Sequence, residues 1–185
     1  MISDLRRQKF TRLFHLWDYN KDGVLQRVDF EQAALGIASF LGIQPGSVEM
    51  DTHMTAYMAG WEQVRQAAHP NGGDQVMLDE FVAATSQALA DPVAFEAITM
   101  TSARNSIRLM DLDGDGRIAR PEYLGVVMAY NMTNDEAEEA FRQLDRDGDG
   151  YITQEESVAN TVEFFMSDDP QARGNWLFGP YTTTD

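Results

Sequence analysis

Carboxylates alternate at fixed intervals within the twelve residues 145–156. Aspartates stand at positions 1, 3 and 5 of this segment, a glycine at position 6 and a glutamate at position 12. This is the pattern of an EF-hand loop, in which hard oxygen ligands surround a Ca²⁺ ion and the final glutamate binds through both of its oxygens. Position 7 contributes its backbone carbonyl. The expected ligands are Asp145, Asp147, Asp149, Tyr151 and Glu156.

The same pattern recurs at residues 111–122. Position 7 is here an arginine, which contributes only its backbone carbonyl, and position 9 is Ala119, so we expect a water molecule in place of a side-chain oxygen. The four carboxylates of each of these two loops favour tight Ca²⁺ binding. The expected ligands of this loop are Asp111, Asp113, Asp115, Arg117 and Glu122.

A third copy occupies residues 18–29, but its twelfth residue is Asp29 in place of glutamate. The shorter side chain reaches a metal less easily with both oxygens. We therefore expect weaker Ca²⁺ binding here, or tolerance of the six-coordinate geometry of Mg²⁺. The sequence thus predicts about three Ca²⁺ sites. The expected ligands of this one are Asp18, Asn20, Asp22, Val24 and Asp29.

A fourth segment, residues 69–80, keeps the outline of the loop without most of its ligands. Position 1 is His69, position 5 is a glycine and position 6 is Asp74, whereas Val76 and Glu80 keep positions 8 and 12. We interpret it as a degenerate hand that has lost its metal. EF-hands work in pairs joined by a backbone bridge at position 8, so the first loop needs Val76 opposite its own Leu25.

Helices on both sides of each loop must hold these ligands in place. Apolar residues at helical spacing, an Asp91-Pro92 start signal and capping boxes at Thr133 and Thr153 mark them. The predicted fold is all-α with two short β bridges: eight main helices in two EF-hand pairs that form one compact globule. The expected domains are residues 1–90, with the active first loop and the degenerate second, and residues 91–185, with the two complete loops and an apolar tail.

The tail after Pro170 carries Trp176, Leu177, Phe178 and Tyr181. So many large apolar side chains in a short terminal segment should fold back into a cleft. Glu156 would close an ion site at the start of the same helix whose far end leads into the tail. Metal binding there is therefore expected to order the chain's own tail more than to recruit a partner.

The composition limits the function classes. A formal charge of −16 disfavours binding to nucleic acid or to anionic membranes and fits cation binding. No run approaches the ~20 apolar residues of a membrane helix, and the start of the chain has no secretory pattern and no myristoylation glycine. The 185 residues include no cysteine, which is compatible with the cytoplasm. We find no catalytic constellation, and expect a cytoplasmic, non-enzymatic monomer without an obligatory protein partner.

Four hands with the second defunct, an elongated first pair and a tryptophan-containing tail resemble the sarcoplasmic calcium-binding protein family, most closely its prokaryotic, calerythrin-like branch. The resemblance covers essentially the whole chain. It implies two EF-hand pairs that face each other across a shared core, and a role as a cytosolic Ca²⁺ buffer or transporter of the ion.

Two other functions stay open. A Ca²⁺ sensor would expose a groove, for which the stripe of Met50, Met54 and Met58 is a candidate, although such a stripe is more often adaptable core. A coelenterazine photoprotein is similar in layout and would line a pocket with aromatic residues, which are also more often core. The pocket candidates are His15, Trp17, His53, Trp61, Trp176 and Tyr181.

Overall fold

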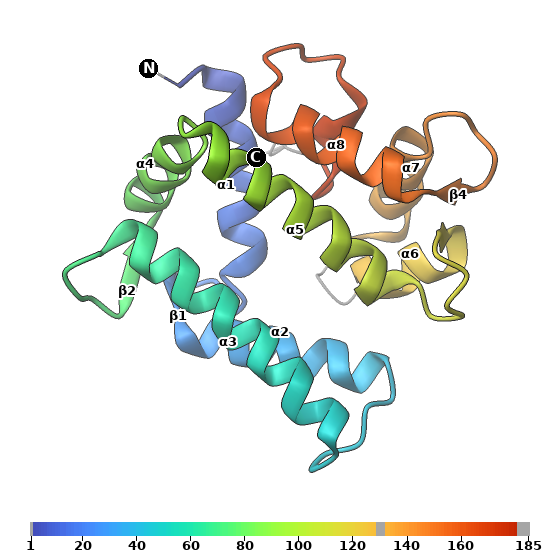
Figure 1. Cartoon of the computed structure of the whole chain (residues 1–185), viewed down its shortest axis with the longest axis horizontal. Coiled ribbons are helices and arrows are strands. Elements are labelled where there is room, and N and C mark those ends of the chain that lie inside the picture. The colour runs from blue at the N-terminus through green and yellow to red at the C-terminus, as the bar shows by residue number, and fades with distance from the viewer. Residues whose placement is uncertain (1, 129–131, 181–185) are drawn as a thin grey trace. The chain divides into compact units, whose positions relative to one another are not determined.

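The computed structural model describes residues 2–128 and 132–180, so Tyr181 of the tail lies outside the described residues. Within those ranges it contains eight α-helices, four short strands and one 3₁₀ helix (Figure 1). The protein is mostly helical, as predicted. The elements are α1 (Asp4–Trp17), β1 (Val24–Gln26), α2 (Arg27–Phe40), α3 (Val48–Ala68), β2 (Gln75–Met77), α4 (Leu78–Ala88), α5 (Pro92–Met110), β3 (Ile118–Ala119), α6 (Arg120–Met128), α7 (Asn134–Leu144), β4 (Tyr151–Ile152), α8 (Gln154–Met166) and η1 (Arg173–Trp176).

Local signals start the helices of the second half where the sequence predicts. The Asp91 carboxylate accepts hydrogen bonds from the amides of Val93 and Ala94 at the start of α5. Thr133 and Thr153 form complete capping boxes with Glu136 and Glu156, so two otherwise unsatisfied amides of α7 and of α8 gain partners. These caps confirm the predicted starts.

Two short antiparallel pairs of strands join the hands. In the first, Leu25 of β1 lies opposite Val76 of β2, and both side chains are 0% exposed. In the second, Ile118 of β3 lies opposite Ile152 of β4. The predicted bridge between the first loop and the degenerate one is therefore confirmed, residue for residue.

Contacts within the chain form two units. One comprises residues 13–88, and the other comprises the residues before 13 together with those from 89 onward. These units differ from the expected domains in the first twelve residues, which group with the second half. The reason is local packing: Phe10 contacts the rings of Phe164 and Phe165 in α8, and Lys9 bonds to the carbonyls of Glu163 and Ser167 at the end of that helix.

The core of the unit 13–88 contains a series of aromatic rings in contact, contributed by α1, α2, α3 and α4. Phe81 contacts both Phe14 and Trp17, Trp17 contacts Phe30, and Phe30 contacts Trp61, with ring centroids 5.6–5.8 Å apart. Such tilted and edge-on contacts stabilise a core beyond the area they bury. Trp17 and Trp61 therefore serve as packing residues of this unit.

The second unit has its own core, to which the tail contributes. Trp176 and Leu177 pack against buried residues of α6 and α7, and the Phe178 ring lies 4.8 Å from that of Phe164. The described part of the tail thus folds back, as its apolar content predicts. The members of the buried cluster are Ile118, Tyr123, Val127, Met132, Ala137, Ala140, Phe141, Leu144 and Ile152.

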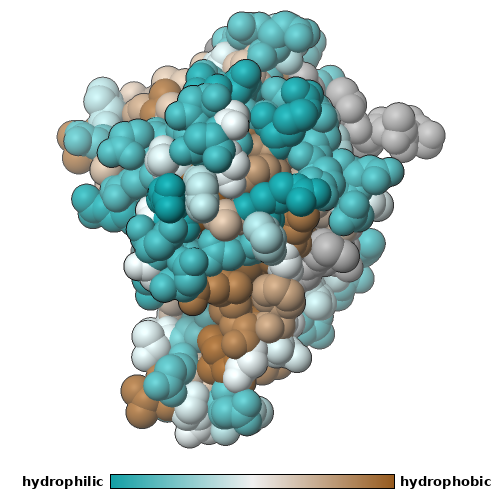
Figure 2. Space-filling model, turned by 90° about the vertical axis from the view of Figure 1, so that its right-hand side faces the viewer, coloured by the Kyte–Doolittle hydropathy of each residue, from teal (hydrophilic) through white to brown (hydrophobic). Residues whose placement is uncertain are grey.

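The surface reflects the acidic composition. On the face drawn in Figure 2, hydrophilic residues cover most of the area, and a patch of hydrophobic residues lies in its lower half. None of the helices in the described residues combines the length and the hydropathy needed to cross a membrane.

Candidate metal centres

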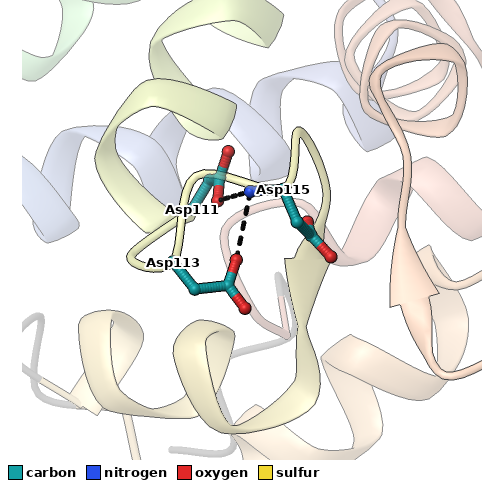
Figure 3. Close-up of side chains that lie close together, drawn as sticks. All are labelled: Asp111, Asp113 and Asp115. Carbon is teal, nitrogen blue, oxygen red and sulfur yellow. Dashed lines mark hydrogen bonds between the residues drawn. The ribbon is translucent and has the colours of Figure 1, made fainter.

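The loop between α5 and α6 brings three aspartates together. One carboxylate oxygen from each of Asp111, Asp113 and Asp115 lies within 4.8 Å of the others. The Asp115 amide donates to both Asp111 (3.0 Å) and Asp113 (3.1 Å), which fixes the turn between them (Figure 3). The other oxygen of Asp111 accepts from the amide of Gly116 at 2.9 Å. Backbone amides thus hold the first three predicted ligands.

Glu122, the predicted closing ligand, reaches across the same loop. Its Oε1 accepts from the amides of Leu112 (2.6 Å) and Asp113 (3.2 Å), and its Oε2 accepts from Ala119 (2.7 Å). The carboxylate is therefore held over the loop by its backbone, but it is not part of the group of three aspartates.

The loop between α7 and α8 gathers a different trio: Asp145, Asp147 and Glu156 each place an oxygen within 4.8 Å of the other two. Glu156 Oε1 accepts from the amides of Arg146 (2.6 Å) and Asp147 (3.4 Å), and Oε2 accepts from Thr153 (2.9 Å). Burial raises the pKa of Glu156, but these hydrogen bonds outweigh it and hold the pKa below its usual value.

Asp149 is not a member of that trio, although its Oδ1 accepts the amide of Tyr151 at 2.9 Å as Asp115 accepts that of Arg117 in the third loop. The sharp turn directly after Asp149 depends on Gly150, whose φ of +91° is costly for other residues. Tyr151 begins β4, and Arg117 directly precedes β3, so the position-7 carbonyls of both loops lead directly into the bridge.

The side chain of Arg117 makes two contacts that are not predicted by its role as a residue whose backbone carbonyl binds the metal. Its Nη2 lies 2.9 Å from Oδ2 of Asp115, and its guanidinium lies 3.8 Å from the ring centroid of Tyr151. The hydrogen bond from Arg117 holds the pKa of Asp115 below its usual range. The Arg117 guanidinium therefore competes with a metal ion for Asp115, a predicted ligand of the third loop, and also contacts Tyr151 of the fourth loop.

The first loop is arranged differently. Asp18 accepts from the amides of Asp22 (3.1 Å) and Gly23 (2.9 Å), while Asp29 accepts from Asn20 (3.3 Å) and Gln26 (2.8 Å). Position 3 of this loop is Asn20, so it has one carboxylate fewer than the other two loops, and its position-7 residue, Val24, begins β1.

Asp29 nevertheless spans its loop as the two glutamates span theirs. It is 0% exposed. Burial raises the pKa of its carboxyl group, which the two amide hydrogen bonds oppose.

The segment 69–80 satisfies its own polar groups in place of a metal. Glu80 accepts the amide of Met77 at 2.8 Å and lies 3.3 Å from Nε2 of His69. Arg65 donates to the carbonyl of Gly73 at 3.3 Å. The bond from Met77 to Glu80 matches those from Ala119 to Glu122 and from Thr153 to Glu156, whereas His69, which contacts Glu80, stands where the other loops have an aspartate. This agrees with a loop that keeps its outline and its bridge without most of its ligands.

The donor sets at the third and fourth loops fit Ca²⁺. They consist of hard oxygens, and three carboxylates within 4.8 Å repel one another unless a cation lies among them. In the fourth loop the neighbouring Arg146 points its guanidinium to Asn160 and Glu163 in α8, away from the trio. Sequence patterns contain no signal for this arginine, because its partners lie 14 and 17 residues away in a different element.

Family and sequence comparisons agree with this geometry. Residues 105–127 match the EF hand family and residues 136–156 match the EF-hand domain family. Calerythrin from Saccharopolyspora erythraea is 24% identical over 139 residues, which are 74% of this chain and 78% of that protein. The sarcoplasmic calcium-binding protein of Perinereis vancaurica tetradentata is 28% identical over 121 residues, 65% of this chain and 67% of that one. The chain contains EF-hands and is similar to sarcoplasmic calcium-binding proteins.

Solved structures show the same fold. The sarcoplasmic calcium-binding protein from amphioxus has a TM-score of 0.72 at 18% identity and covers 97% of this chain and 99% of its own. The coelenterazine-binding protein from Renilla muelleri, in its calcium-loaded apo form, has a TM-score of 0.73 at 20% identity, with 96% and 99% covered. At these identities the likeness to both structures is one of fold. Calcium binding by this EF-hand protein is supported by the family matches and by the calcium-binding relatives.

Proposed function

We propose that this protein is a cytosolic Ca²⁺ buffer, or carrier of the ion, with three sites. The observation that carries the proposal is the convergence of three carboxylates in each of the loops 111–122 and 145–156. At these loops, backbone amides already hold the acidic side chains in place, so the ion replaces its water shell with preorganised oxygens. The ligands that we assign to each loop are those predicted from its sequence, including Glu122 and Asp149.

The first loop is the third proposed site. This loop has one negative charge fewer than the other two, because Asn20 takes the place of an aspartate, and its closing carboxylate is shorter, because Asp29 takes the place of a glutamate. Fewer and shorter carboxylates reduce affinity for Ca²⁺ and reduce discrimination against Mg²⁺. We therefore assign Asp18, Asn20, Asp22, Val24 and Asp29 to a site that both ions share.

Calorimetric titration with Ca²⁺ tests the number and position of the sites. Glu122→Gln and Glu156→Gln should each weaken or remove one binding event, since each loses one charge and one bidentate ligand. Glu80→Gln is the matched control, because it makes the same change at position 12 of the degenerate loop. A parent protein that binds no Ca²⁺, or a Glu80→Gln variant that loses a site, contradicts the proposal.

A Ca²⁺ sensor is the second candidate. Met54 and Met58 are half-buried on α3 and line an open hollow of about 620 Å³ together with Arg27 and Glu31 of α2. Met-rich surfaces of this kind adapt to partner helices in sensors. A hydrophobic dye followed in the same titration separates the two functions: a buffer gives little change in dye fluorescence, whereas a sensor gives a large rise on Ca²⁺ addition.

Packing argues against a photoprotein pocket around the candidate aromatic residues. Trp61 is buried against Phe30, and Nε2 of His53 lies 2.9 Å from the carbonyl oxygen of Ala34. Addition of coelenterazine followed by Ca²⁺ should therefore give no light. The cytoplasmic location, the monomeric state and the absence of enzymatic activity stay predictions from the sequence.

A further inference from the structure

The start of the fourth loop is tied to its own exit helix by buried polar contacts. Asn160 of α8 is 0% exposed, and its amide donates to the carbonyl of Leu144, the last residue of α7, at 2.8 Å. The Asn160 Oδ1 accepts from Nη1 of Arg146 at 2.8 Å. The second residue of the loop and the end of the entry helix therefore share one side-chain partner on α8.

The C-terminal segment, residues 169–180, joins the same network. Arg173 Nη1 donates to the backbone carbonyls of Asp145 (3.2 Å) and Arg146 (2.8 Å). Glu163 lies between the loop and this segment: its Oε1 accepts from Arg146 at 2.7 Å, and its Oε2 accepts from the amide of Gly174 at 2.8 Å. The bond from Arg146 holds the pKa of Glu163 below its usual range, so this carboxylate stays charged.

Close packing at Gly174 fixes the position of the C-terminal segment on α8. A Cβ atom at Gly174 would lie 2.3 Å from the carbonyl oxygen of Asn160 and 2.6 Å from Cβ of Glu163. The next residue, Asn175, is 0% exposed and accepts a hydrogen bond from Lys9 at 3.0 Å. The contacts to the loop therefore depend on a specific docked geometry as well as on apolar burial.

The peptide units at the start of the loop are consequently held from two sides. The Arg146 amide donates to Glu156, the predicted bidentate ligand, while the carbonyls of Asp145 and Arg146 accept from Arg173. We propose that Arg173 is a positioning residue of the fourth calcium site, through which the docked C-terminal segment raises the Ca²⁺ affinity of the loop 145–156. This inference rests on the proposed function of that loop. By reciprocity of linkage, Ca²⁺ bound there strengthens docking of the segment to the same extent.

Electrostatics and positioning predict opposite changes in the Ca²⁺ affinity of the fourth site when Arg173 is replaced. Arg173 carries a positive charge close to the loop and repels Ca²⁺, so the loss of this repulsion alone would increase Ca²⁺ affinity in a variant without it. Positioning predicts a decrease, since the backbone of Asp145 and Arg146 loses its support. We expect Arg173→Ala to weaken the fourth site by roughly five- to tenfold, at the low end of typical coupling between sites.

The experiment is calorimetric Ca²⁺ titration of the full chain as parent, Arg173→Ala, Gly174→Val and Arg142→Ala. Gly174→Val removes docking without removing charge, and its loss of affinity should match that of Arg173→Ala. Arg142→Ala is the matched control. This substitution removes an equal charge near the loop, but Arg142 pairs with Glu139 on the surface of α7 and not with the loop backbone. Unchanged or increased affinity in Arg173→Ala overturns the inference.

Limited chymotrypsin cleavage at Trp176 and Phe178 supplies the reciprocal readout. Ca²⁺ should slow cleavage in the parent and in Arg142→Ala, but not in Glu156→Gln, whose fourth site is disabled. Equal protection in Glu156→Gln and the parent also contradicts the coupling. If Glu156→Gln leaves every Ca²⁺-binding event of the parent intact, the assignment of the site itself fails; if only the Arg173 and Gly174 variants behave as parent, the coupling alone fails.

Discussion

Asp29 closes the first loop with a side chain one methylene shorter than the glutamates of the other two. Both of its oxygens accept backbone amides, and it is fully buried, so a glutamate must find space by a small shift of the loop. We expect Asp29→Glu to raise the Ca²⁺ affinity of this site by about tenfold, or about 1.4 kcal/mol, and to sharpen its preference over Mg²⁺. Calorimetry with both ions measures this, and unchanged affinity together with unchanged discrimination would count against the hypothesis.

Lys9 is a fully buried lysine whose ammonium group bonds to the carbonyls of Glu163 and Ser167 and to the side chain of Asn175. Burial, with a contribution from Arg6, lowers its pKa from 10.5 to about 8. Between these two values the unfolded chain binds a proton that the folded chain does not, so the free energy of unfolding rises with pH.

The comparison of parent with Lys9→Met, by urea unfolding at several pH values, isolates this contribution. The parent should gain stability relative to the variant as pH rises from about 8 to 10.5. If the unfolding free energies of parent and variant change in parallel with pH, the three hydrogen bonds stabilise the charged ammonium group of Lys9 as well as water does.

At the scale of elements, the degenerate second hand is retained for its strand. Leu25 and Val76 face each other at zero exposure across the first bridge. Val76→Ala deletes two buried methyl groups, and should cost about 2 kcal/mol of stability. Because β1 directly follows the ligand-bearing turn, the Ca²⁺ affinity of the first loop should fall as well, with the third and fourth loops unchanged.

Val48→Ala is the matched control for that prediction, since Val48 belongs to the same unit and is 77% exposed. Urea unfolding gives the stability, and calorimetry gives the affinity of each site. A loss of stability with an unaltered first site would restrict the second hand to a purely architectural role.

These elements also show which features a sequence can predict. Helix starts at Asp91, Thr133 and Thr153 depend on residues a few positions apart and were predictable. The strand pair at Leu25 and Val76 was predictable because both residues stand at position 8 of a repeated twelve-residue loop. Distant partners that no repeated motif relates were not predictable. The pattern of α1 indicates which of its faces is apolar, but nothing in it indicates that Lys9 meets residues 163, 167 and 175, so the grouping of the first twelve residues with the second half was missed.

The candidate sites follow the same rule. Twelve-residue spacing predicts which carboxylates share a loop, because the loop backbone alone brings them together. It does not predict which three lie together in each loop: they are Asp111, Asp113 and Asp115 in the third but Asp145, Asp147 and Glu156 in the fourth. It also does not predict that Arg117 pairs with Asp115. Nor does it predict Arg173, whose contact to the fourth loop depends on the docked path of the whole segment after α8.

For the whole molecule, a formal charge of −16 and two groups of converging carboxylates make the ion-free chain self-repelling. Ca²⁺ binds the folded loops and not the unfolded chain, so it stabilises the fold by mass action. At a free concentration of about one hundred times Kd, each site contributes about 2.7 kcal/mol, and two sites about 5 kcal/mol. For a chain of this size that corresponds to a rise in Tm of roughly 10–20 °C.

Scanning calorimetry with Ca²⁺ and with a chelator measures this rise. Screening by salt also relieves repulsion among surface charges, so the chelated sample should contain KCl at matched ionic strength. The double variant Glu122→Gln with Glu156→Gln should lose most of the shift, because it disables both acidic loops but keeps nearly the same net charge. Equal Tm values for the chelated and the Ca²⁺-loaded parent would show that ion binding is not coupled to folding, and a full shift in the double variant would attribute the effect to screening.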